Sequence, residues 1–185
     1  MDDRQIVDLY FQRHEQALAE TSRKYGKYCF SIARNILQNH SDAEETVNDT
    51  YIGAWNSMPP HRPAILSTYL GKITRRLALK RWTANRTLKR GGGEVSLALE
   101  ELAGCIPSDF DVESRIEMTE LTQILNKFVR NLPQPERNVF LCRYWYLYSI
   151  EAIARQQEFS QSKVKSMLSR TRKKLYTHLQ KEGYL

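Results

Sequence analysis

Basic side chains gather near the end of the chain, where residues 163–185 contain seven lysines and arginines and one acidic residue. At helical spacing, five polar or basic side chains share one face: Lys163, Ser166, Arg170, Lys173 and Lys174. A valine and three leucines form the opposite face: Val164, Leu168, Leu175 and Leu179. The major groove of DNA admits one α-helix, whose polar side chains reach base edges while lysines and arginines neutralise phosphates. The pattern therefore predicts a DNA-reading helix, with a solvated basic surface helix as the alternative.

A short helix and a turn are expected just before this basic helix. The pattern predicts the short helix at about 150–157 and the turn at Glu158 and Phe159. Ser160 is a good N-cap for a following helix that ends at about Lys181. Two helices joined by such a short turn, the second of them basic, form a helix-turn-helix, so this context favours DNA binding.

Residues 61–93 form a second basic block, with nine lysines and arginines and no acidic residue. Four side chains share a helical face turned away from the apolar stripe of this segment: Lys72, Arg75, Arg76 and Thr83. Tyr69 and Trp82 lie nearby in the sequence. Cations that follow the backbone, together with rings that stack on bases, suit single-stranded nucleic acid. For each ring, packing in the core is at least as good an interpretation.

Asp42, Glu45 and Asp49 form an acidic stripe on one helix, with Asn48 beside it. Because like charges would repel DNA, the stripe favours contact with a basic protein surface. Clustered carboxylates also bind Mg²⁺ in nucleases, although a solvated acidic face is the commoner explanation. No ligand from another segment stands out, so neither a metal nor a cofactor is predicted.

The chain has 185 residues, of which 26% are charged and 41% hydrophobic, as is usual for a globular protein of one domain or two small ones. No apolar run approaches the roughly 18 to 20 residues that span a bilayer, and no secretion signal begins the sequence. A cytoplasmic protein without membrane insertion is therefore expected. The three cysteines form no C-x-x-C pair and are expected to be buried or free thiols: Cys29, Cys105 and Cys142.

Apolar residues recur at intervals of three and four almost everywhere, which predicts an all-α fold. In the first half, two helices are expected at about 4–20 and 24–38. A third is expected to begin at a capping box formed by Ser41 and Glu44 and to end at Pro59, and a fourth is expected from residue 66 to the triple glycine at 91–93. In the second half, they are expected at 114–131 and 136–146, ahead of the helix-turn-helix. The stretch between is acidic, with a short helix at 97–103. The prediction is two small helical domains, 1–90 and 114–185, joined by an acidic linker, 91–113.

Three segments resemble, in this order, parts of the bacterial sigma factors of the sigma-70 family. Residues 42–55 resemble the helix that binds the clamp of RNA polymerase. Residues 69–78 resemble the helix that melts the promoter and reads its minus-10 element, and residues 132–175 are similar to the domain that reads the minus-35 element. With these two modules and a short linker, the chain resembles the extracytoplasmic-function (ECF) type.

The resemblance implies roles for individual residues. The resemblance implies that four residues bind polymerase: Asp42, Glu45, Asn48 and Asp49. Of these, Asn48 and Asp49 replace the Gln-Glu pair that is usual in the family. Contact with the melted minus-10 strand falls to Arg62, Tyr69, Lys72, Arg75, Arg76 and Lys80. Reading of the minus-35 duplex falls to Lys165, Ser166, Ser169 and Arg170, to which the basic helical face adds Lys163, Lys173 and Lys174. Leu147 and Glu158 occupy positions where glycine is usual.

These roles describe a sigma factor that binds core RNA polymerase at its clamp and flap and directs promoter-specific initiation, with no catalysis by this chain. An anti-sigma factor is a further partner to consider. The alternative is a dimeric helix-turn-helix regulator that works without polymerase. Such a regulator needs an apolar self-association face, which the sequence does not identify, and it leaves the acidic stripe unexplained.

Overall fold

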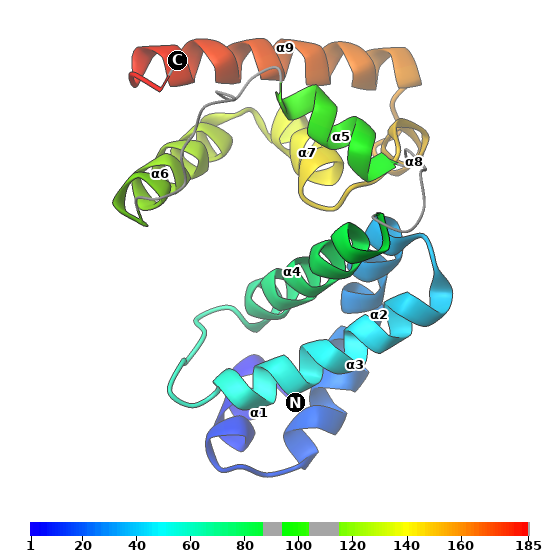
Figure 1. Ribbon diagram of the computed structural model, residues 1–185, viewed down its shortest axis with the longest axis vertical. Coiled ribbons are helices and arrows are strands. Elements are labelled where there is room, and N and C mark those ends of the chain that lie inside the picture. The colour runs from blue at the N-terminus through cyan, green and yellow to red at the C-terminus, as the bar shows by residue number, and fades with distance from the viewer. Residues whose placement is uncertain (87–93, 104–114, 185) are drawn as a thin grey trace. The chain divides into compact units, whose positions relative to one another are not determined.

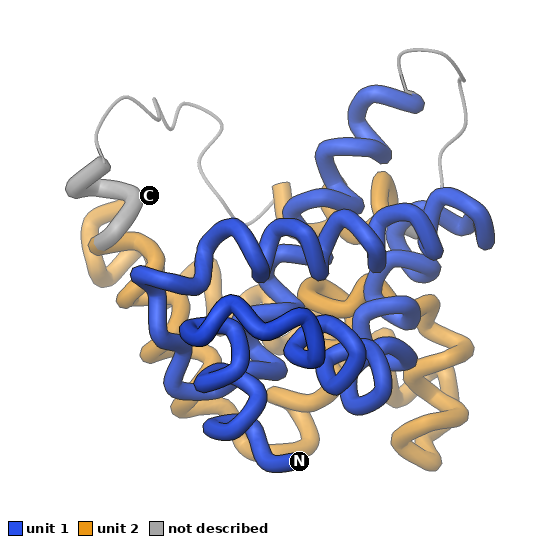
Figure 2. The backbone as a smooth tube through the Cα atoms, turned by 90° about the horizontal axis from the view of Figure 1, so that it is seen from below, with its two compact units in different colours: residues 1–91 blue, residues 92–185 orange. Residues whose placement is uncertain are grey.

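The structure, a computed structural model, describes residues 1–86, 94–103 and 115–184. All regular elements within these ranges are helices, which confirms the predicted all-α fold. The chain divides into two compact units, Met1–Gly91 and Gly92–Leu185 (Figure 2). Among the described residues, no helix is both long and apolar enough to cross a membrane.

Unit 1 contains four described helices (Figure 1): α1 Asp3–Phe11, α2 Gln16–Leu37, α3 His40–Ser57 and α4 Leu66–Arg86. Helices α2, α3 and α4 pack against one another, and α1 packs on α2. Their core includes fully buried side chains from every helix, among them Tyr10, Cys29, Ala54 and Leu70. Cys29 is a free thiol, and burial raises its pKa.

The break between the first two helices differs from the prediction. It falls at residues 12–15 rather than 21–23, so the expected helices at 4–20 and 24–38 are wrong in their limits. Arg13 adopts a left-handed conformation (φ 54°) and donates a hydrogen bond of 2.6 Å to the carbonyl of Trp55 in α3. Thr21, placed in the predicted break, is fully buried in α2, where its hydroxyl bonds that of Tyr10 at 2.9 Å.

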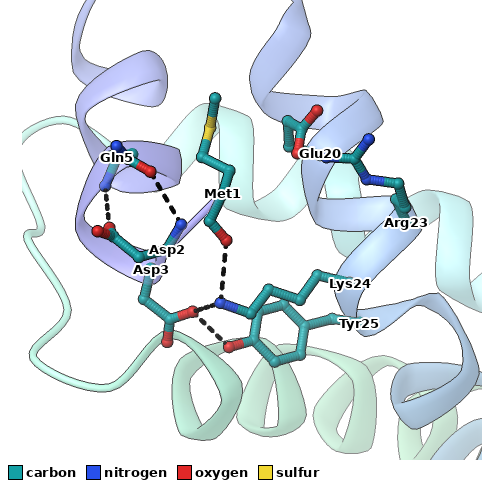
Figure 3. A network of polar contacts seen from close by, with 8 residues as sticks. All are labelled: Met1, Asp2, Asp3, Gln5, Glu20, Arg23, Lys24 and Tyr25. Carbon is teal, nitrogen blue, oxygen red and sulfur yellow. Dashed lines mark hydrogen bonds and ion pairs between the residues drawn. The ribbon is translucent and has the colours of Figure 1, made fainter.

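Polar contacts also join α1 to α2 (Figure 3). Asp2 and Gln5 form a capping box at the start of α1, with both hydrogen bonds at 2.9 Å. Asp3 Oδ1 accepts hydrogen bonds from Lys24 Nζ and from the Tyr25 hydroxyl, each 2.6 Å long. Burial and the bond to Asp3 raise the pKa of Tyr25, which therefore stays a neutral donor.

Helix α3 has its N-cap two residues earlier than predicted. Its N-cap is Asn39, whose Oδ1 accepts a hydrogen bond of 3.0 Å from the amide of Asp42, so the capping box at Ser41 and Glu44 is wrong. Both Asn and Ser are good N-caps, and Asn39 has the extended backbone that an N-cap requires. The helix ends at Ser57, before the two prolines, as expected.

Unit 2 contains five described helices: α5 Glu94–Ala103, α6 Arg115–Asn131, α7 Gln134–Tyr144, α8 Ile150–Gln156 and α9 Gln161–Lys181. Helix α9 packs on α6, α7 and α8, and α5 packs on α7 (Figure 1). The predicted apolar face of α9 is buried, with Val164, Leu168, Leu175 and Leu179 at most 2% exposed. Cys142 of α7 is a free, buried thiol.

Residues 94–103 of the expected linker are helical and belong to unit 2. Helix α5 covers residues 94–103, and its Val95 and Ala98 are each 1% exposed. The short helix predicted at 97–103 is therefore present and begins earlier. The triple glycine at 91–93, Cys105 and the rest of the expected linker lie outside the described residues.

Candidate nucleic-acid interface

Helices α8 and α9 form the predicted helix-turn-helix, and side chains cap both helices. Ser149 Oγ accepts a hydrogen bond of 3.1 Å from the amide of Ala152 at the start of α8. In the turn, the amide of Phe159 donates to the carbonyl of Ala154 at 2.9 Å. Ser160 Oγ then accepts from the amide of Lys163 at 3.2 Å, as the sequence predicts for an N-cap.

The exposed face of α9 carries the residues predicted to read DNA. Lys165, Ser166, Arg170 and Lys173 are exposed, and Ser169 is half-buried beside them. Within the described part of the chain, none of the three basic side chains in this group forms an ion pair. They are therefore available to phosphates and base edges.

The two remaining predicted members of this face already have partners inside unit 2. The Nζ of Lys163 lies 3.6 Å from the centroid of the Phe159 ring, and the Nζ of Lys174 lies 2.7 Å from Glu136 Oε2. Both amino groups are held near the first and middle turns of α9. A DNA phosphate would have to compete for Lys174, whereas Lys163 keeps its hydrogen-bond donors free above the ring.

Among the described residues of unit 2, two that are not glycine adopt the left-handed backbone that glycine favours. Leu147, before α8, has φ 57°, and Glu158, in the turn before α9, has φ 54°. The resemblance expects glycine at both positions, so the backbone path of a glycine turn is kept by larger residues. Leu147 is 3% exposed, whereas Glu158 is exposed. The side chain of Leu147 therefore contributes buried apolar area, whereas that of Glu158 lies exposed to solvent.

In unit 1, the basic face of α4 borders a pocket of about 350 Å³. Its walls come from α3, the following loop and α4: Gly53, Ser57, His61, Tyr69, Lys72, Ile73 and Arg76. The Tyr69 hydroxyl donates a hydrogen bond of 2.6 Å to Ser57 Oγ, which fixes the ring at one side of the pocket. Lys72, Arg76 and Lys80 are exposed along the same face of α4. The pocket thus combines an aromatic ring with cationic groups.

Two predicted minus-10 residues lie elsewhere. Arg62 forms an ion pair with Asp8 of α1, and its guanidinium lies 4.9 Å from the centroid of the Phe11 ring. Arg75 is only partly exposed, and burial lowers the pKa of its guanidinium. Arg75 is therefore less open to solvent than its neighbours Lys72 and Arg76, which are exposed.

The acidic stripe of α3 meets a cation from α4 that sequence reasoning missed. We call this group the Arg81 cluster: Arg81, Asp42, Glu45 and Asp49. The guanidinium nitrogens of Arg81 lie 2.6 Å from Glu45 Oε2, 3.6 Å from Asp49 Oδ2 and 3.8 Å from Asp42 Oδ1. The hydrogen bond and the charge of Arg81 lower the pKa of Glu45. One cation thus holds three carboxylates along the helix.

The rest of this face of α3 is open. Asn48 is exposed, and Ile52, one turn further on, is 58% exposed. The surface is therefore acidic with one apolar side chain. In the described ranges, no group of three or more His, Cys, Asp or Glu side chains could hold a metal ion.

Comparisons with known proteins assign a family to both units. The family model for sigma-70 region 2 matches residues 22–87, and that for sigma-70 region 4 matches residues 122–175. The chain belongs to the sigma-70 family. It is also 27% identical over 176 residues to the RNA polymerase sigma factor NccH of Alcaligenes xylosoxydans xylosoxydans, an alignment that covers 91% of this chain and 84% of that protein.

These matches locate the candidate surfaces within an ECF-type sigma-70 protein. Region 2 covers α3 and α4, which carry the Arg81 cluster and the pocket beside Tyr69. Region 4 covers α7, α8 and the part of α9 that carries the exposed reading face. Helices α1 and α5 lie outside both matched ranges.

Proposed function

We propose that this sigma-70 protein directs promoter-specific initiation by dividing three tasks between its units. Unit 1 binds core RNA polymerase through α3 and holds the melted minus-10 strand against α4. Unit 2 reads the minus-35 duplex with α9. The observation that carries the proposal is the exposed reading face of α9, presented by a capped helix-turn-helix within the matched region 4.

The packing of α9 in unit 2 supports its role in reading duplex DNA. The buried leucines fix its inner face, so Ser166, Ser169 and Arg170 project together from the outer face near its N-terminal half. Arginine can bond two acceptors of a guanine at once, and serine can donate to or accept from a base edge. Lys165 and Lys173 supply charge for the phosphates on either side.

The pocket on unit 1 supports a role in holding a single strand. Its volume of about 350 Å³ lies in the range of small-ligand sites and suits one unstacked nucleobase. The Tyr69 ring offers a surface for stacking, while Lys72 and Arg76 lie where they can pair with adjacent phosphates. Lys80 extends the positive charge along α4.

Polymerase binding is assigned to the exposed side of α3. The Arg81 cluster has three carboxylates and one guanidinium, so the surface keeps a net negative charge after internal pairing. A basic partner surface would be attracted to it, and the exposed Ile52, one turn further along α3, would provide an apolar contact beside it. We assign this partner to the polymerase clamp. Catalysis stays with polymerase in the cytoplasm, and the role asks for no cofactor from this chain.

The test is whether the purified chain co-elutes with bacterial core RNA polymerase on size exclusion and adds discrete run-off transcripts on genomic fragments. The proposal expects a stable complex and new transcripts that depend on the added chain. DNA binding without polymerase association would instead favour the dimeric regulator. The absence of both polymerase and promoter binding would reject both roles.

A further inference from the structure

Helix α5 places one carboxylate among three donors of unit 2. We call this group the Glu101 cluster: Glu101, Arg143, Tyr144 and Arg172. Arg143 donates from Nη2 to Glu101 Oε1 at 2.7 Å and from Nε to Oε2 at 3.3 Å, which makes the pair bidentate. Oε2 also accepts from the Tyr144 hydroxyl at 2.9 Å and from Arg172 Nη1 at 3.2 Å.

The two arginines connect this carboxylate to both helices of the helix-turn-helix. Arg172 belongs to α9, two positions after Arg170 of the reading face. Arg143 belongs to α7, and its Nη1 donates at 3.1 Å to the carbonyl of Tyr148, the residue before the N-cap of α8. Glu101 is therefore bonded directly to α9 and, through Arg143, to the entry of α8.

The burial of the cluster makes its geometry restrictive. The side chain of Arg143 is 1% exposed, and those of Glu101 and Arg172 are 24% and 25% exposed. Burial alone would raise the pKa of Glu101, but the hydrogen bonds from Arg143 and Tyr144 and the charges of both arginines bring it below its ordinary value. Glu101 is thus ionised at neutral pH, and its position fixes that of two buried or half-buried cations.

We propose that Glu101 is a positioning residue for duplex reading, because it sets the orientation of α9 relative to α8. Helix α5 is then a working part of the DNA-reading unit, although it lies outside both matched family regions. The inference rests on the proposed reading of the minus-35 element by α9. Arg172 serves as the link: Glu101 and the Tyr144 hydroxyl, 2.9 Å from its Nη1, hold it away from DNA.

The test uses the full chain with core polymerase on a promoter found by run-off transcription. The measured quantity is the ratio of transcript from the intact promoter to transcript from one with a scrambled minus-35 element. Glu101→Gln keeps an acceptor for Arg143 but removes the charge that holds Arg172. We expect this ratio to fall about fivefold or more, as for one misaligned base contact. Its matched control is Glu100→Gln, an exposed neighbour with the same change of charge, which should leave the ratio unchanged.

A second variant separates positioning from stability. Arg172→Gln frees α9 while leaving the pair between Glu101 and Arg143, and its control is Lys181→Gln, an exposed position on the same helix. If Glu101 acts through Arg172, the transcript ratio of the double variant should fall no further than that of the more strongly affected single variant. All variants are compared at a temperature where circular dichroism shows them folded, so a purely structural role would leave the ratio unchanged.

The outcomes distinguish this inference from the proposed function. In one outcome, folded Glu101→Gln gives the same transcript ratio as its control Glu100→Gln, while Arg170→Ala lowers that ratio. The positioning role of Glu101 is then wrong, and duplex reading by α9 stands. Independent, additive losses from Glu101→Gln and Arg172→Gln would also overturn the role. If the wild-type chain supports no promoter-dependent transcript, the proposed function itself fails.

Discussion

The two charged clusters of this protein are built on opposite plans. In unit 1, one cation, Arg81, is shared by three carboxylates at an open surface, where the side chain of Glu45 is 62% exposed. In unit 2, one carboxylate, Glu101, is shared by two arginines and a tyrosine around a side chain that is 1% exposed. The Arg81 cluster leaves surplus negative charge facing solvent, whereas the Glu101 cluster uses its charges within the unit.

Burial decides what each cluster can do. Ion pairs at an exposed surface contribute little to stability, because water and salt already screen the charges. Removing one partner of a buried pair leaves the other charge without compensation and destabilises the fold strongly. The comparison therefore teaches that the Arg81 cluster is suited to binding and the Glu101 cluster to holding a shape.

The largest expected effect tests this contrast directly. Glu101→Ala should lower the free energy of unfolding of unit 2 by about 3 to 5 kcal/mol, because the buried Arg143 loses its bidentate ion pair with Glu101. Arg81→Ala should leave the stability of unit 1 nearly unchanged. Hydrogen exchange at increasing urea concentration distinguishes the two units and so measures both free energies of unfolding. Equal losses in the two units would break the comparison.

The next effect concerns binding. Asp49→Lys reverses a charge 3.6 Å from Arg81 and leaves two cations side by side on the α3 surface. We expect at least about a tenfold loss of affinity for core polymerase, measured by titration, with unchanged circular dichroism. Glu15→Lys makes the same change of charge at an exposed site before α2 and serves as the control. Retention of full affinity would remove polymerase binding from the Arg81 cluster.

Substitutions in the turns test whether these turns, rather than Glu101, set the geometry of unit 2. Leu147→Gly relieves a left-handed backbone but removes a buried side chain, and should destabilise by about 2 kcal/mol or more. Glu158→Gly relieves the same conformation at an exposed site and should stabilise by up to about 1 kcal/mol. Thermal melting checks the opposite signs. If Glu158→Gly lowers the minus-35 ratio as Glu101→Gln does, the turn shares the positioning role.

The smallest effect is a pH dependence. The pKa of Glu101 lies below its ordinary value of 4.5, so its ionised form contributes stability that is present above that value and lost as the pH falls through the folded pKa. Unit 2 of the wild type should therefore lose more stability below about pH 4.5 than unit 2 of Glu101→Gln. Identical acid profiles of the two proteins would contradict the assigned ionic state.

Periodicity predicts the helices and their buried faces well, because the spacing of apolar residues reports burial directly. It predicts the inner face of α9, and local chemistry predicts the N-cap Ser160 at the start of that helix. It fails at residues 12–15, where apolar spacing continues across the break and Arg13 bonds a carbonyl of α3 instead.

Contacts between distant segments explain what the sequence could not predict. Arg81 meets Glu45 across 36 positions, and Arg143 meets Glu101 across 42, with no periodic signal to connect them. Arg81 is one of nine cations in a basic block, so its type and spacing do not distinguish it from Lys72 or Lys80. The sequence offered one clue, which is that the acidic stripe of α3 needs a cation from another segment to neutralise it.

The central claim is that the two units carry separable tasks in one initiation factor. The most direct measurement is run-off transcription by core polymerase with Arg170→Ala, assayed together with polymerase co-elution. The account predicts that Arg170→Ala still co-elutes with polymerase but loses most of its dependence on the minus-35 element. Unchanged minus-35 dependence in a correctly folded Arg170→Ala protein would contradict the account.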